Sequence, residues 1–263
     1  MDLQLKGQTG LVTGGTAGIG LEIARTLARE NARVVITGRN QAKLDDAIAD
    51  IKGSGGGDVI GVLADAATAE GAATIAQAIP AVDILINNLG IYESKAFGEI
   101  TDADWTRLFE VNVMSGVRLS RAYLPGMLER NRGRIIFIAS ESGLAIPTDM
   151  IHYGMTKTAQ LAVSRGLAQM TRGTNVTVNT VMPGPTRSEG IEAFLRSQAS
   201  DPSAPLKEIE AEFFAKARAA SIIQRMIEAE EIANLVAYLA SPRSSATNGA
   251  ALRAEGGLVN TIA

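Results

Sequence analysis

Short apolar segments alternate with longer amphipathic ones along the whole chain, and this alternation restricts the possible folds more than any other feature. The segment 34–37 is continuous in Val, Ile and Thr, as strands covered on both faces tend to be. The amphipathic segment before it carries Ile19, Ile23 and Leu27 at four-residue spacing, which forms one buried face of a helix. Alternation of this kind predicts an α/β fold with one doubly wound parallel sheet, flanked by helices on both faces.

The same reasoning places the remaining elements and one interruption. The predicted strands are 10–13, 34–37, 59–63, 82–87, 134–139, 176–181 and 250–253, and the later predicted helices are 68–79, 101–129, 150–172 and 228–240. The glycine-rich piece 53–57 lies inside the alternation, so residues 1–263 are expected to form a single domain. The segment from 186 to 225 interrupts the alternation, and Pro202 and Pro205 divide it into two predicted short helices.

Composition and charge exclude several classes of protein. The net charge is −3, with acidic and basic residues interspersed, which argues against a nucleic-acid partner. No run reaches the ~18 apolar residues of a membrane span, and the start of the chain lacks the pattern of a secretory signal. With no cysteine and a single histidine, His152, neither disulfides nor a metal site is expected. We therefore expect a cytoplasmic protein without membrane, nucleic-acid or metal partners.

A glycine-rich turn joins the first predicted strand to the first predicted helix. Gly14, Gly18 and Gly20 follow the strand and open the helix. Small residues let the backbone approach a pyrophosphate, and the N-terminus of a helix favours its negative charge. The turn therefore predicts dinucleotide binding on a Rossmann-type sheet, although a simple tight turn could have the same sequence.

Arg39 lies at the end of the second predicted strand, about twenty residues beyond this turn. A carboxylate at such a position binds the adenosine 2′-hydroxyl group, whereas an arginine accommodates a 2′-phosphate. Thr37, Gly38 and Asn40 beside it include no acid. Arg39 therefore favours NADP(H) over NAD(H), against the alternative of a solvated arginine at a strand end.

Ser140, Tyr153 and Lys157 lie within one short stretch of the chain. On a helix, Tyr153 and Lys157 would lie one turn apart on the same face. An ammonium group near a phenol stabilises the phenolate, so we expect Lys157 to lower the pKa of Tyr153 from its usual value of about 10. Such a phenol could exchange a proton with a substrate near neutral pH. Taken alone, the spacing favours a half-buried tyrosine and a solvated lysine, and only the rest of the chain reverses this interpretation.

Taken together and in this order, the motifs resemble the classical short-chain dehydrogenase/reductase family. The matching features are Thr13-Gly14-x-x-x-Gly18-Ile19-Gly20, Asn87-Asn88-x-Gly90, Ser140, Tyr153-x-x-x-Lys157 and Pro183-Gly184. The resemblance covers essentially the whole chain, and the joint pattern is far more specific than any one of its parts.

The resemblance implies roles for the matching positions. The catalytic set would comprise Asn112, Ser140, Tyr153 and Lys157. The cofactor would be bound by Gly14, Thr16, Gly18, Ile19, Gly20, Arg39, Asp65, Asn88, Leu89, Gly90, Tyr153, Lys157, Pro183, Gly184 and Thr186. Asp65 would contact the adenine and Thr186 the nicotinamide carboxamide, while Asn112 would hold a water that links Lys157 to solvent.

Two departures from the family pattern concern the cofactor. Leu89 stands where the family commonly has alanine and brings a bulkier side chain near the cofactor. The glycine turn carries Thr16 and Ala17, without the basic residue that often accompanies NADP(H) use. Arg39 is therefore the main indication of NADP(H).

The activity that the resemblance implies is hydride transfer between a ketone or aldehyde and an alcohol, and we expect an NADP(H)-dependent carbonyl reductase. Tyr153 would donate a proton to the carbonyl oxygen, and Ser140 would hydrogen-bond to it. Three alternatives stay open: a 3-oxoacyl-[acyl-carrier-protein] reductase, an NAD-dependent alcohol dehydrogenase and a non-catalytic nucleotide-binding protein of the same fold. The first would need a basic surface near the site, for which the candidates are Arg121, Arg130, Arg132 and Arg134.

The substrate is the least specified part of the prediction. The segment 188–223 is expected to form part of the pocket and to act as a lid. Its large apolar residues would either line the cavity or pack onto the sheet; they are Phe194, Leu195, Phe213, Phe214, Ile222 and Ile223. Glu141, Ser142 and His152 could touch substrate, but we favour packing or surface roles for them.

The resemblance also implies an assembly, because the family is commonly tetrameric. The two long predicted helices, 102–129 and 150–172, would then be the dimer faces.

Overall fold

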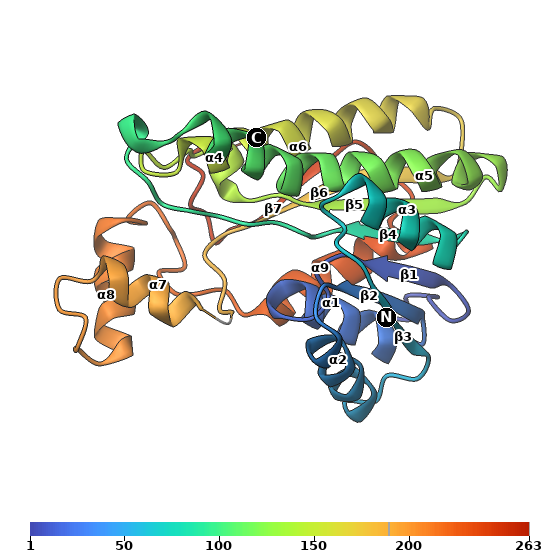
Figure 1. The fold of residues 1–263 in the computed structure, drawn as a ribbon, viewed down its shortest axis with the longest axis horizontal. Coiled ribbons are helices and arrows are strands. Elements are labelled where there is room, and N and C mark those ends of the chain that lie inside the picture. The colour runs from blue at the N-terminus through green and yellow to red at the C-terminus, as the bar shows by residue number, and fades with distance from the viewer. Residues whose placement is uncertain (189, 263) are drawn as a thin grey trace.

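One sheet contains all strands found in residues 1–188 and 190–262, which the computed structural model describes (Figure 1). Their order is β3-β2-β1-β4-β5-β6-β7, and every neighbouring pair is parallel. The strands are β1 Thr9–Val12, β2 Arg33–Gly38, β3 Val59–Leu63, β4 Ile84–Asn87, β5 Gly133–Ile138, β6 Val176–Pro183 and β7 Ala251–Ala254. The predicted doubly wound parallel sheet is confirmed.

Helices cover both faces of this sheet because its strands expose apolar side chains alternately to each side. In β2, Val34 and Ile36 belong to one core, whereas Val35 belongs to the other. The first core is closed by α1 Gly18–Arg29, α2 Gln41–Gly53 and α9 Ala229–Ala240. The second core is closed by α3 Ala69–Ala78, α5 Ser115–Glu129 and α6 Ile151–Met170 (Figure 1).

The helix predicted over 101–129 is not uniform, which corrects that prediction. It begins as α4 Asp102–Phe109 behind the expected cap at Thr101, whose hydroxyl accepts from the Asp104 backbone N–H at 3.2 Å. A π-helical turn, Glu110–Met114, then separates α4 from α5. The turn contains Asn112, whose side chain bonds to a neighbouring loop instead of pointing to solvent. Turns of this kind often mark functional positions in helices.

The interruption after β6 comprises residues 186–188 and 190–225, which we call the lid segment after its predicted role; Glu189 and Ala263 lie outside the described residues. It contains the two predicted short helices, α7 Ile191–Gln198 and α8 Leu206–Lys216. The lid segment has a small core of its own, formed by Leu195, Ile209, Phe213 and Phe214 together with Met226, which directly follows the segment. In Figure 1, α7 and α8 lie at one end of the molecule, apart from the helices that cover the sheet.

None of the described helices is both long and apolar enough to cross a membrane.

Candidate active site

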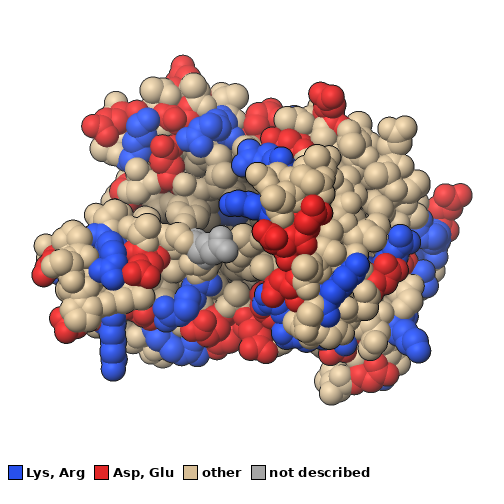
Figure 2. All heavy atoms as spheres, turned by 60° about the horizontal axis from the view of Figure 1, so that its bottom comes forward, with Lys and Arg blue, Asp and Glu red and all other residues tan. Residues whose placement is uncertain are grey.

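A cavity of about 430 Å³ opens beyond the carboxyl ends of the central strands, where ligands bind on doubly wound sheets. Its lining includes the residues that follow β1, β4, β5 and β6, among them Gly14, Asn88, Ser140 and Gly184. The lid segment supplies Phe194 from α7 and Phe213 from α8. Figure 2 shows a hollow in the molecular surface with both acidic and basic side chains near it.

Thr13 holds the glycine turn against the loop that follows β4. Its hydroxyl donates to the carbonyl oxygen of Ile86 at 3.3 Å and accepts from the backbone N–H groups of Asn88 and Leu89, both at 3.0 Å. The side-chain amide of Asn88 in turn donates to the carbonyl oxygen of Thr13 at 2.9 Å. Two of the predicted cofactor motifs therefore form one hydrogen-bonded unit at the edge of the sheet.

The glycine turn fits a pyrophosphate by its shape and by its unpaired donors. Gly14 and Gly18 have φ values of +61° and +54°, a region that glycine adopts without strain. A Cβ atom on Gly20 would lie 2.4 Å from both the Gly14 carbonyl oxygen and the Asn88 side-chain nitrogen. The N-cap residue Ala17 offers no side-chain acceptor, so the first N–H groups of α1 are left for a ligand.

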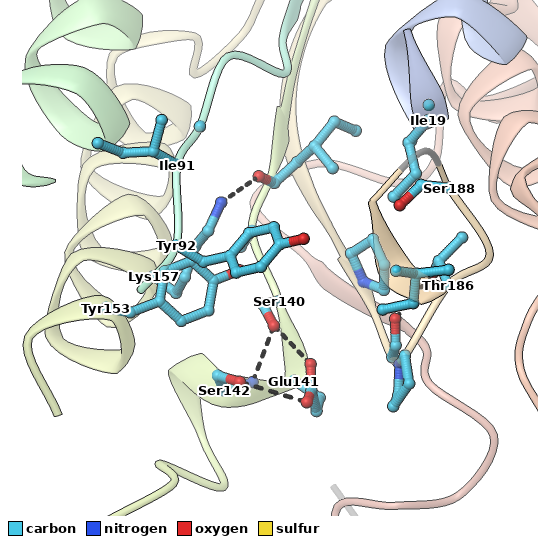
Figure 3. Close-up of a pocket in the computed structure, with 18 of the residues that line it drawn as sticks. Ile19, Ile91, Tyr92, Ser140, Glu141, Ser142, Tyr153, Lys157, Thr186 and Ser188 are labelled. Carbon is cyan, nitrogen blue, oxygen red and sulfur yellow. Dashed lines mark hydrogen bonds between the residues drawn. The ribbon is translucent and has the colours of Figure 1, made fainter. Parts of the chain in front are cut away.

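Ser140, Tyr153 and Lys157 line the same cavity (Figure 3). Ser140 follows β5, and α6 carries Tyr153 and Lys157 one turn apart. The Lys157 side chain is only 4% exposed, and its Nζ donates to the Ile138 carbonyl oxygen at 3.0 Å. That Nζ lies 5.5 Å from the centre of the Tyr153 ring. The structure thus brings the three predicted residues together.

The pKa of Tyr153 differs from the sequence-based expectation. Burial raises it, and the nearby Glu141 carboxylate raises it further, whereas the hydrogen bond with Ser140 lowers it. Burial also lowers the pKa of Lys157 to about 8, so this lysine is fully charged only below that pH. In the protein alone, the phenol is therefore held protonated, in the form that can donate a proton.

Asn112 lies behind Lys157, and its side chain is committed to protein groups. Its Oδ1 accepts from the Ile91 backbone N–H at 2.8 Å, and its Nδ2 donates to the Ile91 carbonyl oxygen at 2.9 Å and to Thr156 Oγ1 at 3.0 Å. Asn112 thus fixes the loop after β4 beside the cavity. Its role as a water holder stays a prediction.

Arg39 and Asp65 lie outside the cavity wall, beyond the ends of β2 and β3. Arg39 Nη1 is 3.7 Å from Asp65 Oδ2, and the Arg39 side chain is 74% exposed. Thr16 lies close to this pair, since a Cβ atom on Gly38 would be 2.8 Å from its methyl group. Their predicted contacts with the adenosine end of a dinucleotide stay a prediction.

Most predicted cofactor residues line the cavity. They are Gly14, Gly18, Ile19, Gly20, Asn88, Leu89, Gly90, Tyr153, Lys157, Pro183, Gly184 and Thr186. Thr186 donates its hydroxyl proton to the Gly184 carbonyl oxygen at 2.8 Å, which fixes its side chain at the start of the lid segment.

Several cavity residues do not follow from sequence reasoning. Glu141 and Ser142, for which we favour packing, line the cavity; the signal for them was their position directly after Ser140. His152 is buried against Trp105, with ring centres 5.9 Å apart, and does not line it. Arg218 lines the cavity from the end of the lid segment, and no local sequence pattern predicts that position for it.

The apolar residues of the lid segment only partly follow the two predicted roles, because those that are buried outside the cavity wall pack in the lid segment's own core and not onto the sheet. Phe194 and Phe213 line the cavity, whereas Leu195 and Phe214 are buried in the lid core. Ile222 is 79% exposed and Ile223 is 39% exposed, so neither prediction describes them.

The four arginines considered as a carrier-protein surface lie elsewhere. The side chains of Arg130, Arg132 and Arg134 bond to Val82, Asp83 and Asn175, at the amino ends of the strands. Arg121 lines a separate groove between α5 and α6. The cavity opens at the opposite, carboxyl edge of the sheet.

This fold and this arrangement are those of a dinucleotide-binding oxidoreductase. The sequence matches the family model for short chain dehydrogenases over residues 8–199. The chain therefore belongs to the short-chain dehydrogenase/reductase family, whose members act on alcohol and carbonyl groups.

Individual relatives agree with this assignment. The chain is 51% identical to the uncharacterised oxidoreductase YvaG of Bacillus subtilis, with all of both chains covered. It is 31% identical to the 3-oxoacyl-[acyl-carrier-protein] reductase FabG of Vibrio cholerae, over 97% of this chain and 99% of the relative. Its structure superimposes on L-sorbose reductase from Gluconobacter frateurii, solved with NADPH and L-sorbose, with a TM-score of 0.93, 30% identity and full coverage of both chains.

Gly20→Ala tests the fit of the glycine turn. The added Cβ would lie 2.4 Å from backbone and side-chain atoms that shape the turn, so we expect NADPH affinity to fall at least about tenfold, measured by quenching of nucleotide fluorescence. The matched control is Gly166→Ala on α6, where a Cβ would meet no atom within 4 Å. Equal NADPH affinity in both variants would contradict the placement of the pyrophosphate.

Proposed function

We propose that the protein is an NADP(H)-dependent carbonyl reductase that converts a ketone or aldehyde to an alcohol. The observation that carries this proposal is the convergence of Ser140, Tyr153 and Lys157 in one cavity with the glycine turn. A protonated phenol, a hydroxyl donor and a buried ammonium are the groups that reduction of a carbonyl requires from the protein.

When bound, the nicotinamide cofactor supplies the hydride that the carbonyl carbon receives. The side chains of the protein act on the carbonyl oxygen. Tyr153 donates its phenolic proton to the oxygen as negative charge develops there, and Ser140 donates a hydrogen bond to the same oxygen. Removing a comparable oxyanion donor costs about 3–4 kcal/mol in other enzymes.

Lys157 acts on Tyr153 and on the cofactor region. Its Nζ lies beside the phenol ring and is fixed by the Ile138 carbonyl oxygen. After proton transfer, the charged Lys157 would stabilise the phenolate until a proton returns from solvent. Its position next to Gly90, where a Cβ would lie 3.4 Å from Nζ, also supports contact with the nicotinamide ribose.

Arg39 supports NADP(H) as the cofactor. Its guanidinium is exposed at the end of β2, where it could receive a 2′-phosphate, and no carboxylate replaces it there. The L-sorbose reductase with which the chain superimposes was solved with NADPH.

Two alternatives within the family are less well supported. A carrier-protein substrate would need basic residues near the cavity, and the arginines considered for that role lie at the other edge of the sheet. An NAD-dependent alcohol dehydrogenase would leave Arg39 without a phosphate partner. A non-catalytic nucleotide-binding protein would have no use for a lysine buried beside a tyrosine, because burying an ammonium group destabilises the fold.

Tyr153→Phe tests the proposed proton donor. We expect turnover to fall by about 10²–10⁴-fold, because general acid catalysis contributes that much, while the dissociation constant of NADPH stays unchanged. NADPH consumption with a panel of ketones measures turnover, and Tyr238→Phe on α9 is the matched control. A Tyr153→Phe variant that retains most of its rate would overturn the assignment.

Arg39→Asp tests the cofactor preference. An aspartate would repel the 2′-phosphate and accept hydrogen bonds from the 2′-hydroxyl group, so the ratio of kcat/KM for NADPH to that for NADH should fall by about tenfold or more. Arg33→Asp, at the opposite end of the same strand, is the control. If the ratio does not move in the Arg39 variant, Arg39 is not the phosphate contact.

We also propose a homotetramer built on the surface of α5 and α6. An apolar groove between these helices has a volume of about 400 Å³ and is lined by Val117, Arg121, Leu124, Pro125, Leu128, Val163, Leu167 and Met170. Met170 is 61% exposed and lines this groove together with five other apolar side chains and Pro125, so the groove offers a contiguous apolar surface that a partner could cover.

Met170→Glu would place a charge in that interface. We expect it to lower the mass measured by sedimentation equilibrium, whereas Phe97→Glu, at another exposed apolar position, should leave the mass unchanged. A wild-type protein that sediments as a monomer would contradict the proposed assembly.

A further inference from the structure

Glu141 is a buried carboxylate in the cavity wall, immediately after the proposed catalytic serine. The residue is 4% exposed. Its Oε2 accepts from Ser140 Oγ at 2.5 Å and its Oε1 accepts from Ser142 Oγ at 3.2 Å (Figure 3). An ionised carboxylate can accept about four hydrogen bonds, so these two donors leave roughly half of its capacity unused.

Arg218 faces Glu141 from the end of the lid segment. Its Nε lies 3.5 Å from Glu141 Oε1, and its guanidinium carbon is 5.4 Å from the centre of the Phe213 ring. Among the described residues, this Nε is buried and has no hydrogen-bond partner. The two charged groups therefore approach each other without a well-formed hydrogen bond between them.

Burying such a pair lowers the stability of the fold unless a ligand supplies the missing hydrogen-bond partners. Desolvation of two charges commonly offsets their mutual attraction, and buried charges are retained where their remaining polar atoms find partners. Here both residues line the cavity, and the Nε of Arg218 is buried without a hydrogen-bond partner beside the Glu141 carboxylate. One group that both donates and accepts a hydrogen bond would satisfy them together, and a hydroxyl group does this.

We propose that Glu141 and Arg218 select a neutral ketone that carries a hydroxyl group on the carbon next to the carbonyl. This inference rests on the proposed function and names the substrate class of the same site. The substrate hydroxyl donates to the Glu141 carboxylate and accepts from Arg218 Nε.

The position of the hydroxyl follows from the contact between Ser140 and Glu141. Ser140 binds the carbonyl oxygen in the proposed mechanism, and Glu141 Oε2 is one hydrogen bond away from Ser140 Oγ. A hydroxyl group on the carbon next to the carbonyl is close enough to reach this carboxylate while the carbonyl oxygen stays on Ser140.

The same contact links recognition to catalysis. Ser140 has one hydroxyl proton, and in this structure it is donated to Glu141, so it cannot be donated to a carbonyl at the same time. A substrate hydroxyl that donates to an unused lone pair of Glu141 shares the charge of the carboxylate, which weakens the bond from Ser140 and makes the Ser140 proton easier to donate to the carbonyl oxygen. Compared with a ketone that lacks the hydroxyl group, a hydroxylated ketone should therefore have a higher kcat as well as a lower KM.

Other substrate classes satisfy the pair less well. A hydrocarbon ketone would leave the Arg218 Nε unpartnered and Ser140 bonded to Glu141. A carboxylate next to the carbonyl would suit Arg218 but would lie against the negative charge of Glu141.

Four ketones with the same carbon skeleton test the proposal in NADPH assays of the full chain. They are 3-hydroxybutan-2-one, 4-hydroxybutan-2-one, butan-2-one and 2-oxobutanoate. We expect kcat/KM for 3-hydroxybutan-2-one to exceed that for butan-2-one by at least about 100-fold, because sites built to bond a hydroxyl strongly reject analogues that lack it. The values of kcat/KM for 4-hydroxybutan-2-one and 2-oxobutanoate should be lower than that for 3-hydroxybutan-2-one. The kcat should also be higher for 3-hydroxybutan-2-one than for these two ketones.

Two variants, one of each member of the pair, assign the selectivity to Glu141 and Arg218. Glu141→Gln and Arg218→Met should each lower the ratio of kcat/KM for 3-hydroxybutan-2-one to that for butan-2-one by about tenfold or more, the value of a hydrogen bond to a charged group. Arg218→Met keeps the packing on Phe213, so it tests the donor if Glu141→Gln folds poorly. The control is Glu192→Gln, an exposed carboxylate of α7 in a separate ion pair with Arg196.

The outcomes separate this inference from the proposed function. NADPH-dependent reduction of butan-2-one or 2-oxobutanoate in preference to 3-hydroxybutan-2-one would overturn the inference and leave the carbonyl reductase intact. A selectivity ratio that is unchanged in both cavity variants would overturn the roles of Glu141 and Arg218. If none of the four ketones is reduced and none of the corresponding alcohols is oxidised, the result would count against both the reductase and its substrate class.

Discussion

The parallel hydrogen bonding of the central strands is the constraint on which the site depends. Because β1, β4, β5 and β6 run the same way, their carboxyl ends meet at one edge, and residues far apart in the chain share one cavity. Thr13 makes this alignment more precise by binding the turn after β1 to the loop after β4. The start of α1 then faces the cavity with unpaired N–H groups. The sheet thus provides the framework, and a few hydrogen bonds set the final positions.

The electrostatics of the cavity come from four ionisable groups in a small space, namely Glu141, Tyr153, Lys157 and Arg218. Glu141 raises the pKa of Tyr153, and burial lowers the pKa of Lys157 to about 8. The Glu141 carboxylate therefore affects the proton affinity of both Tyr153 and Lys157, beside the larger effect of burial on each. A positively charged nicotinamide ring would favour the phenolate, which matters for alcohol oxidation, whereas the protein alone favours the phenol, which reduction uses.

Sequence reasoning predicted the site residues whose positions follow from the strands and helices that carry them. It did not predict features that depend on contacts with distant parts of the chain. The glycine turn, Ser140 and Tyr153 could be predicted because each follows a strand or lies on a helix next to one. The π-helical turn at Asn112 could not, because it depends on hydrogen bonds to Ile91, which lies outside that helix. The pKa of Tyr153 also could not, because it depends on burial and on the Glu141 charge. Arg218 reaches the cavity only through the folding of the lid segment.

The separate core of the lid segment has a consequence for how such enzymes diversify. The sheet is stabilised by two large cores on its faces, and the lid segment packs mainly through its own cluster around Phe214. Substitutions in α7 and α8 can therefore remodel the substrate wall without weakening the framework that holds the dinucleotide. Natural variation in substrate range should concentrate there, and a transplanted lid from a relative is a practical starting point for redesign.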